Sequence, residues 1–174
     1  MAVDLDFDTL SLKDALDLAI LVEEEAQERY EEFVRQMELH HTPKAAEFFR
    51  FMAENEAKHG RELASRRRQL FGDAAADVDR SMLFDVEAPG YETARAFMSR
   101  REALELALEA ENKAWDFFDR ALPRITDDEV RALFEELREE EVEHQQLVKA
   151  EMSKLDPEAL EVDPDDYVDP PRAL

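Results

Sequence analysis

Apolar and polar residues alternate along this chain with the period of an α-helix. Apolar side chains recur at spacings of three and four in four segments, at about residues 12–39, 43–71, 100–122 and 127–155. Short breaks divide the first segment from the second and the third from the fourth, whereas residues 72–98 show little periodicity. The pattern predicts an all-α protein, an antiparallel four-helix bundle in which a long crossover joins two helical hairpins.

Residues typical of helix ends support these limits. Pro43 fits the first turn of the second helix, and Gly72 follows its last residue. Two capping-box patterns predict the starts of the third and fourth helices: Ser99 with Glu102 and Thr126 with Glu129. Residues 156–174 are acidic and rich in proline, which predicts a C-terminal tail after a bundle domain of residues 1–155.

The predicted buried seam of each helix carries polar residues near its middle. Helices that cross at a shallow angle bury positions spaced alternately four and three apart. On that spacing nearly every seam position is apolar except six central ones: Glu23, Glu56, His59, Glu111, Glu141 and His144. The same spacing turns the neighbouring glutamates toward solvent: Glu24, Glu25, Glu139, Glu140 and Glu143.

Six ionisable side chains in one apolar interior favour a metal site. In a Glu-x-x-His pair the two residues lie on one face of a helix with Cβ atoms about 5–6 Å apart, so both can reach one ion. Four buried carboxylates without cations would be strongly unfavourable, and two divalent cations would neutralise them. Oxygen ligands with two imidazoles suit Fe(II) or Mn(II), and zinc can also bind such a site. Taken singly, each Glu could instead belong to a solvated face and each His could be a hydrogen-bonded core residue.

Composition and charge exclude several classes of function. Charged residues make up 39% of the 174 residues and only 3 are glycine, which favours long, exposed helices. The net charge of -23 argues against binding to nucleic acid and to anionic membranes. The chain has no cysteine, which excludes disulfides and thiolate metal sites. No apolar stretch approaches the roughly 18 residues of a membrane span, so we expect a cytoplasmic protein.

The two halves of the chain resemble each other and a known family. EEEAQERY in the first helix parallels ENKAWDFF in the third, and ENEAKHGREL in the second parallels EEEVEHQQLV in the fourth. Over residues 12–152, this pattern of Glu-x-x-Ala-x-x-x-aromatic and Glu-x-x-His resembles the rubrerythrin family of the ferritin-like superfamily. The resemblance implies a ferritin-like bundle with two Fe ions. It also implies three kinds of ligand: terminal (Glu23 and Glu111), bridging (Glu56 and Glu141) and one histidine for each iron (His59 and His144).

The chain departs from the family pattern in two places. Full-length rubrerythrins carry a cysteine-ligated rubredoxin domain, which this sequence lacks, so an external electron-donor protein would be needed. Ala114 stands where they carry a second carboxylate on the third helix. This difference favours a simpler site of six ligands, as in ferritin ferroxidase centres. Tyr30, two turns after Glu23, could hydrogen-bond a ligand carboxylate or could be a core tyrosine.

The resemblance implies a non-haem di-iron oxidoreductase in which Fe(II) reacts with O₂ or H₂O₂. Peroxide reduction and ferroxidase activity are both compatible with it, and either would serve iron homeostasis or defence against oxidative stress. Three alternatives stay open: a di-metal oxygenase, a non-enzymatic iron carrier and a helical interaction module. Because ferritin-like bundles usually pair, we expect a homo-oligomer, namely a dimer.

Overall fold

The predicted helices are present in the computed structural model, which describes residues 6–39, 43–80 and 99–155. These residues form four long α-helices and one short 3-10 helix: α1 (Leu12–Leu39), α2 (Pro43–Phe71), α3 (Arg100–Ala121), η2 (Leu122–Arg124) and α4 (Asp128–Met152). The predicted all-α, four-helix fold is therefore confirmed. Most of the predicted crossover (81–98) and all of the predicted tail (156–174) lie outside the described residues.

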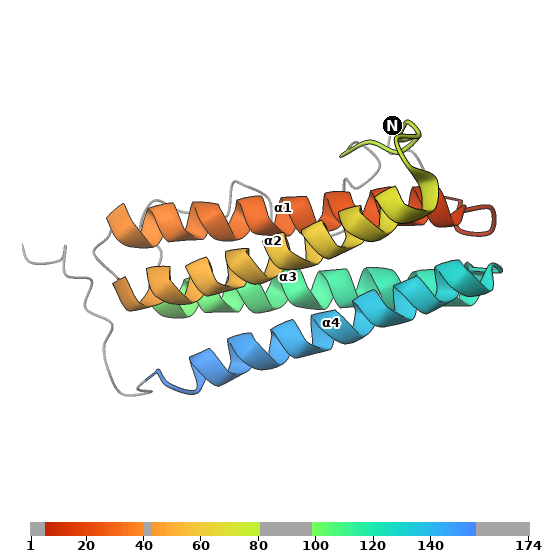
Figure 1. Cartoon of the computed structure of the whole chain (residues 1–174). Coiled ribbons are helices and arrows are strands. Elements are labelled where there is room, and N and C mark those ends of the chain that lie inside the picture. Colours follow the sequence, from red (N-terminus) through yellow and green to blue (C-terminus); the bar gives the residue numbers. More distant parts are fainter. Residues whose placement is uncertain (1–5, 40–42, 81–98, 156–174) are drawn as a thin grey trace, which may run out of the picture.

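The helices pair as two antiparallel hairpins. α1 and α2 lie side by side with opposite directions, as do α3 and α4 (Figure 1). α1 also contacts α4. After α2 the chain turns back toward α1. There Lys13 forms an ion pair with Asp77 (Nζ–Oδ2 2.8 Å), and Arg80 pairs with Glu28 (Nη2–Oε1 2.7 Å). These contacts fasten the first residues of the crossover to the outside of the first hairpin.

The start of α3 and the end of α2 follow the local sequence. The backbone N–H of Glu102 donates to Ser99 Oγ (3.1 Å), and the backbone N–H of Ser99 donates to Glu102 Oε2 (2.9 Å). The predicted capping box is therefore confirmed. Gly72 has a φ of 59°, a left-handed conformation that glycine adopts without a Cβ penalty, and its N–H donates to the carbonyl of Arg68 (2.9 Å). This glycine ends α2.

The predicted cap of α4 is wrong by one residue. Asp127, not Thr126, is the N-cap, and its carboxylate accepts from the backbone N–H groups of Glu129 (2.9 Å) and Val130 (3.0 Å). The hydroxyl of Thr126 instead donates to the carbonyl of Asp8 (3.3 Å). Asp is at least as good an N-cap as Thr, so the aspartate takes the position once the threonine has another partner. The helix begins at residue 128 and ends at residue 152, somewhat inside the predicted limits.

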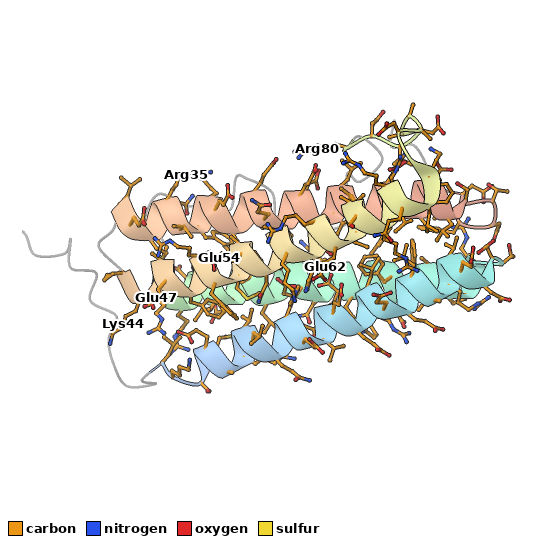
Figure 2. The ribbon with its side chains drawn as sticks, viewed as in Figure 1. Arg35, Lys44, Glu47, Glu54, Glu62 and Arg80 are labelled. Carbon is orange, nitrogen blue, oxygen red and sulfur yellow. The ribbon has the colours of Figure 1, made fainter. Side chains whose placement is uncertain are left out.

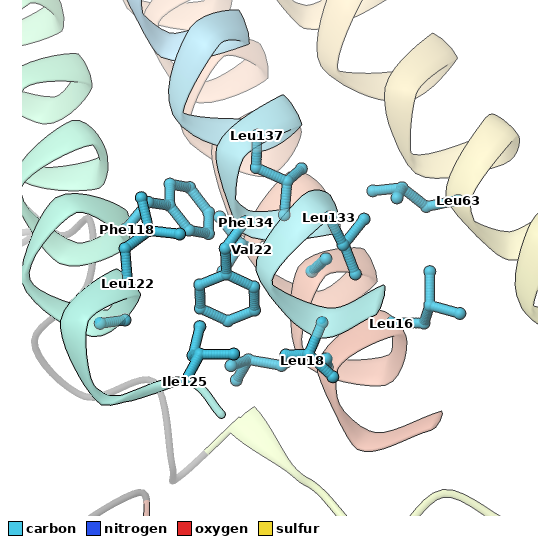
Figure 3. Close-up of a cluster of buried hydrophobic side chains, with 14 residues drawn as sticks. Leu16, Leu18, Val22, Leu63, Phe118, Leu122, Ile125, Leu133, Phe134 and Leu137 are labelled. Carbon is cyan, nitrogen blue, oxygen red and sulfur yellow. The ribbon is translucent and has the colours of Figure 1, made fainter. Parts of the chain in front are cut away.

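The apolar core is divided into two clusters along the bundle. The first lies at the end where α1 begins, and in Figure 3 it joins residues of all four helices and η2, among them Leu16, Val22, Leu63, Phe118 and Phe134. The second lies at the other end and includes Tyr30, Phe33, Phe49, Leu104 and Val148. On each helix the sequence changes from one cluster to the other near its middle. The polar seam residues stand at that change.

The predicted seam is buried with few exceptions. Leu70 was expected inside but is 54% exposed, whereas Phe71 packs against the first cluster. A strict seven-residue spacing drifts by about 20° per heptad relative to a straight helix, and over α2 the drift moves the last position off the seam. Charged side chains cover the outside of the bundle, as Arg35, Glu47 and Glu54 show in Figure 2. Within the described residues no helix is long and apolar enough to cross a membrane.

Candidate metal centre

The six polar seam residues meet between the two apolar clusters. Each of the four helices contributes at least one of them, so the cluster occupies the middle of the bundle. Five are buried: Glu23, Glu56, Glu111, Glu141 and His144. The sixth, His59, is less enclosed, with 17% of its side chain exposed. The arrangement therefore has a deeply buried side and a side that is nearer to solvent.

Candidate ligand atoms converge in three overlapping groups. In each group the nitrogen or carboxylate oxygen atoms all lie within 4.8 Å of one another. The groups are Glu56 with His59 and His144, Glu111 with Glu141 and His144, and Glu23 with His59 and Glu140. All six predicted residues belong to at least one group. Their assignment as metal ligands stays a prediction.

On the buried side, His144 of α4 is surrounded by carboxylates. Its Nδ1 atom lies 3.3 Å from Glu56 Oε1, 3.3 Å from Glu111 Oε2 and 3.9 Å from Glu141 Oε2. These oxygens come from α2, α3 and α4, so three helices meet at one imidazole nitrogen. Glu56 also belongs to a group that contains His59, so its carboxylate lies near both histidines.

On the more open side, His59 of α2 has longer contacts. Its Nδ1 atom lies 3.9 Å from Glu23 Oε2 and 3.8 Å from Glu140 Oε2. Both separations exceed hydrogen-bond length. Across the site, the rings of His59 and His144 stack with their centroids 5.3 Å apart. The two histidines are therefore neighbours, each facing its own set of carboxylates.

Glu140 was predicted to face solvent, and that prediction is wrong. Its side chain is 29% exposed and reaches the edge of the site, where it groups with Glu23 and His59. The prediction used only the positions spaced alternately four and three apart. A helix in a bundle also buries residues beside those positions, because its buried stripe is wider. The sequence did contain a signal, because Glu140 stands one helical turn before His144 and seven residues after Leu133, which is fully buried.

Tyr30 connects the second apolar cluster to the site. Its ring is buried against Phe33 and Phe49, and its hydroxyl donates a hydrogen bond to Glu111 Oε1. Burial raises the pKa of Tyr30 well above its usual value, and the nearby charge of Glu111 adds to the rise. The phenol therefore stays protonated and acts as a donor. Phe118, the matching aromatic residue on α3, has no hydroxyl to donate.

The two sides of the site also differ in their electrostatics. Burial opposes the charged form of His144, but the hydrogen bond and charge of Glu111 outweigh it and raise the pKa of His144. Burial likewise opposes ionisation of Glu111, but His144 holds the pKa of Glu111 below its usual value. On the other side, burial and then the charge of His144 lower the pKa of His59. The protein alone thus supplies an ion pair on the buried side only.

Two carboxylates on the open side resist ionisation in the metal-free protein. Burial raises the pKa of Glu23 to about 7; a hydrogen bond with Glu56 opposes the rise, and the charge of Glu140 adds to it. Burial and the charge of Glu136 raise the pKa of Glu140 to about 7. Crowded carboxylates of this kind become ionised readily when a cation lies among them. The electrostatics therefore favour binding of a cation on this side.

The donor atoms fit divalent metal ions. Glu23 Oε2 and His59 Nδ1 are buried atoms without a hydrogen-bond partner, a state that costs free energy unless another ligand satisfies them. Carboxylate oxygens with imidazole nitrogens suit iron, manganese and zinc. Ligands of one ion with bonds of about 2.1 Å stand roughly 3–4 Å from each other, which matches the separations around both histidines.

A small cavity adjoins the site between α2 and α4. Its volume is about 130 Å³, and it is lined by His59, Glu62, Leu63, Arg66, Glu136, Leu137 and Glu140. At its rim, Arg66 Nη1 lies 3.1 Å from Glu136 Oε2. The cavity brings the open side of the site close to solvent, and its lining carries more carboxylates than cationic groups.

Comparisons with known proteins place the chain in a family. The family model for rubrerythrin matches residues 14–158, which include all six clustered residues. A crystal structure of an uncharacterized conserved protein from Magnetospirillum magnetotacticum MS-1 has a similar fold, with a TM-score of 0.72 and 27% sequence identity. That alignment covers 87% of this chain and 99% of the other. A comparison with curated proteins found no match. The helical bundle, its internal cluster of carboxylates and histidines, and the family match together show that this chain belongs to the rubrerythrin family.

Proposed function

We propose that this protein is a non-haem di-iron oxidoreductase that reacts with O₂ or H₂O₂. The observation that carries the proposal is the meeting of His59 and His144 between carboxylates of all four helices. Membership of the rubrerythrin family supports iron as the metal. When bound, paired iron ions supply the electrons that reduce the oxidant.

The neighbours of each histidine suggest how the residues divide between two ions. His59 with Glu23 would hold one ion, and His144 with Glu111 would hold the other. Glu56 groups with both histidines, which suits a bridging carboxylate. Glu141 would be the second bridge, in line with the family pattern, and it lies with Glu111 and His144. Four carboxylates would then balance the charge of two divalent cations.

Other residues of the chain set the environment of these ligands. Tyr30 orients Glu111 through its hydrogen bond, and the two apolar clusters exclude water on either side of the site. Ala114 of α3 is fully buried, and its methyl side chain provides no additional carboxylate. The ligand set is closer to a ferroxidase centre than to a rubrerythrin with its second α3 carboxylate. We therefore favour oxidation of Fe(II), with peroxide as one oxidant.

The size of the neighbouring cavity favours a small oxidant over an organic substrate. Pockets that bind organic ligands usually measure about 300 Å³ or more. The cavity beside His59 has about 130 Å³, which is enough for O₂ or H₂O₂ and a few waters. This supports a peroxidase or ferroxidase more than an oxygenase.

Peroxide reduction over many turnovers would require electrons from outside these 174 residues, because they contain no cysteine for a rubredoxin-type iron site. In the ferroxidase reaction the Fe(II) substrate would itself supply the electrons. We propose an external electron-donor protein, a cytoplasmic location and a role in iron homeostasis or defence against oxidative stress. A homodimer is part of the same proposal. The strongly negative net charge of -23 suits a partner with a basic docking surface.

The proposal can be tested by loading the protein with Fe(II) without oxygen and then adding O₂ or H₂O₂. We expect near-ultraviolet ferric absorbance to rise together with consumption of the oxidant, faster than for the same Fe(II) in buffer. Glu56→Ala should abolish this acceleration, whereas Glu54→Ala, at an exposed position on the same helix, should retain it. Iron that binds without accelerated oxidant consumption would instead indicate a carrier.

A further inference from the structure

The two histidines have equal numbers of carboxylate neighbours only if Glu140 is included. His144 has Glu56, Glu111 and Glu141 near its Nδ1 atom. For His59 the corresponding neighbours are Glu23, Glu56 and Glu140. Glu140 comes from α4, the helix that already supplies His144, but it faces the other histidine. The helix α4 therefore contributes side chains to both sides of the site.

We propose that Glu140 is a further ligand of the site, which binds the divalent cation held by His59 and Glu23. The proposal rests on the proposed function, because it adds a ligand to the metal centre described there. It assigns to Glu140 a role that the predicted set of six residues does not contain. The ligand is a divalent cation that accepts oxygen and nitrogen donors, such as Fe(II) or Mn(II).

The distances suit shared coordination better than direct contact. Glu140 Oε2 and Glu23 Oε2 lie 3.8 and 3.9 Å from His59 Nδ1, which is too far for hydrogen bonds. Ligand atoms of one ion with bonds of about 2.1 Å stand roughly 3–4 Å apart. A single cation among these three atoms would contact all of them with only small side-chain adjustments.

A second observation points to a ligand at the same place. The side chain of Glu23 is 5% exposed, and its Oε2 atom has no hydrogen-bond partner. The Nδ1 atom of His59 is also buried without a partner. On the opposite side, His144 is satisfied by Glu111 within the protein. Two unsatisfied buried atoms, Glu23 Oε2 and His59 Nδ1, therefore lie where Glu140 approaches, and one cation would satisfy both.

Glu140 also lies on the path from solvent. It lines the cavity between α2 and α4 together with His59, Glu62 and Glu136. Its side chain is 29% exposed, in contrast to 5% for Glu23, so a cation that enters through the cavity meets Glu140 before Glu23. Arg66, the cationic residue of the lining, is paired with Glu136 and leaves Glu140 available. The residue can therefore receive a cation and hold it beside His59.

Titration of the metal-free protein with Mn(II), followed by the electron paramagnetic resonance signal of free Mn(II), tests the inference. We expect the wild type to bind two ions. Glu140→Gln should weaken one of them by about tenfold or more and leave the other unchanged, because a direct ligand is lost from one ion only. Glu139→Gln and Glu143→Gln remove the same charge from exposed positions on α4 and should leave both affinities near the wild-type values.

A variant with a shorter acidic side chain distinguishes direct coordination of the cation from long-range attraction by the carboxylate charge. Glu140→Asp keeps the charge but shortens the reach, so it should also weaken the ion beside His59. Wild-type affinities in Glu140→Asp with weaker binding in Glu140→Gln would indicate charge alone and overturn the ligand role. Unchanged affinities in both variants would overturn it as well, while two ions bound to the wild type would still support the metal centre. A wild type that binds no Mn(II) and no Fe(II) would overturn both proposals.

Discussion

The imidazole rings of His59 and His144 lie almost parallel, with 8° between their planes and 5.3 Å between their centroids. They belong to equivalent Glu-x-x-His segments of α2 and α4, which the two similar halves of the chain place face to face. Their surroundings are nevertheless different. His144 is hydrogen-bonded to Glu111 in the buried interior, whereas His59 Nδ1 has no hydrogen-bond partner and adjoins a cavity. Substitutions of the two residues should therefore have different effects.

We expect His144→Ala to destabilise the metal-free protein far more than His59→Ala. Removal of His144 leaves the buried carboxylate of Glu111 without its cationic partner, and the loss of one partner from a buried ion pair costs about 3–5 kcal/mol. Removal of His59 breaks no hydrogen bond of its Nδ1 atom. Urea unfolding of both variants in the presence of a chelator measures the difference.

The same two variants should each lose about half of the bound metal, or more. Gln146→Ala, at an exposed position on α4, is the matched control and should bind as the wild type does. Elemental analysis after loading with Fe(II) gives the number of ions per chain. Full metal content in both histidine variants would contradict the assignment of these residues as ligands. Equal loss of metal-free stability would contradict the asymmetry between them.

Tyr30→Phe should weaken metal binding without disturbing the core. The ring of Tyr30 stacks on Phe49 with 6.1 Å between centroids, and phenylalanine preserves this packing. Loss of a hydrogen bond to a ligand carboxylate typically lowers metal affinity about tenfold to hundredfold, and here Glu111 would lose its donor. Phe33→Leu alters the neighbouring ring and should reduce stability but not affinity. An unchanged affinity for Mn(II) in Tyr30→Phe would show that the hydroxyl serves packing alone.

Much of the fold could be predicted from the sequence because local signals agreed with one another. The spacing of apolar residues, the Ser99 capping box and Gly72 all indicate the helix limits that the structure has. The position of the polar cluster followed from the same spacing, since polar residues on all four seams stand at similar depth. The cap of α4 was missed because Thr126 and Asp127 are both good caps. Only the contact between Thr126 and Asp8, remote in sequence, decides between them.

Contacts between helices were harder to predict. The position of Tyr30 suggested a hydrogen bond to a carboxylate but not that the acceptor is Glu111 of α3. Glu140 lies one residue from the seam position Glu141, and its orientation depends on how far α4 is rotated relative to α2. The spacing of residues along one helix does not indicate how that helix is rotated relative to its neighbour. The missed residue is therefore one whose role depends on the partner helix.

The raised pKa of Glu140 predicts a pH dependence of stability in the metal-free protein. Burial, and then repulsion from Glu136, give the folded protein a pKa of about 7 at Glu140, against an ordinary value of 4.5. Between these two pH values, Glu140 is mostly ionised in the unfolded chain but mostly protonated in the folded protein. The folded state is therefore favoured at low pH, and this contribution is lost as pH rises through that window. The charges of Glu62 and Glu143 act in the same direction, and that of His144 opposes them.

Glu140→Gln should remove this contribution and flatten the pH profile. Because the side chain is partly exposed, we expect a difference on the order of 1 kcal/mol between about pH 5 and about pH 7.5. Glu23 is retained in the variant but loses the charge of Glu140, which raises its pKa in the wild type, so the comparison measures Glu140 together with its effect on Glu23. Glu139→Gln, at an exposed position, should retain the wild-type slope. Identical slopes for wild type and Glu140→Gln, measured by urea unfolding with a chelator present, would contradict the prediction.

Gly60 follows His59 inside α2, and we expect its replacement by alanine to stabilise the protein. A Cβ at this position would lie 3.5 Å from the Cβ of Glu23, an ordinary van der Waals contact. Alanine in place of glycine in a helix interior gains about 0.5–1 kcal/mol. Gly72→Ala is the matched comparison; its φ of 59° is strained for alanine, so it should lose about 1 kcal/mol. Thermal unfolding of both variants measures whether each substitution raises or lowers the stability of the protein. A loss of stability in Gly60→Ala would instead show that the first hairpin requires a closer approach of α2 to Glu23 than the contact distance indicates.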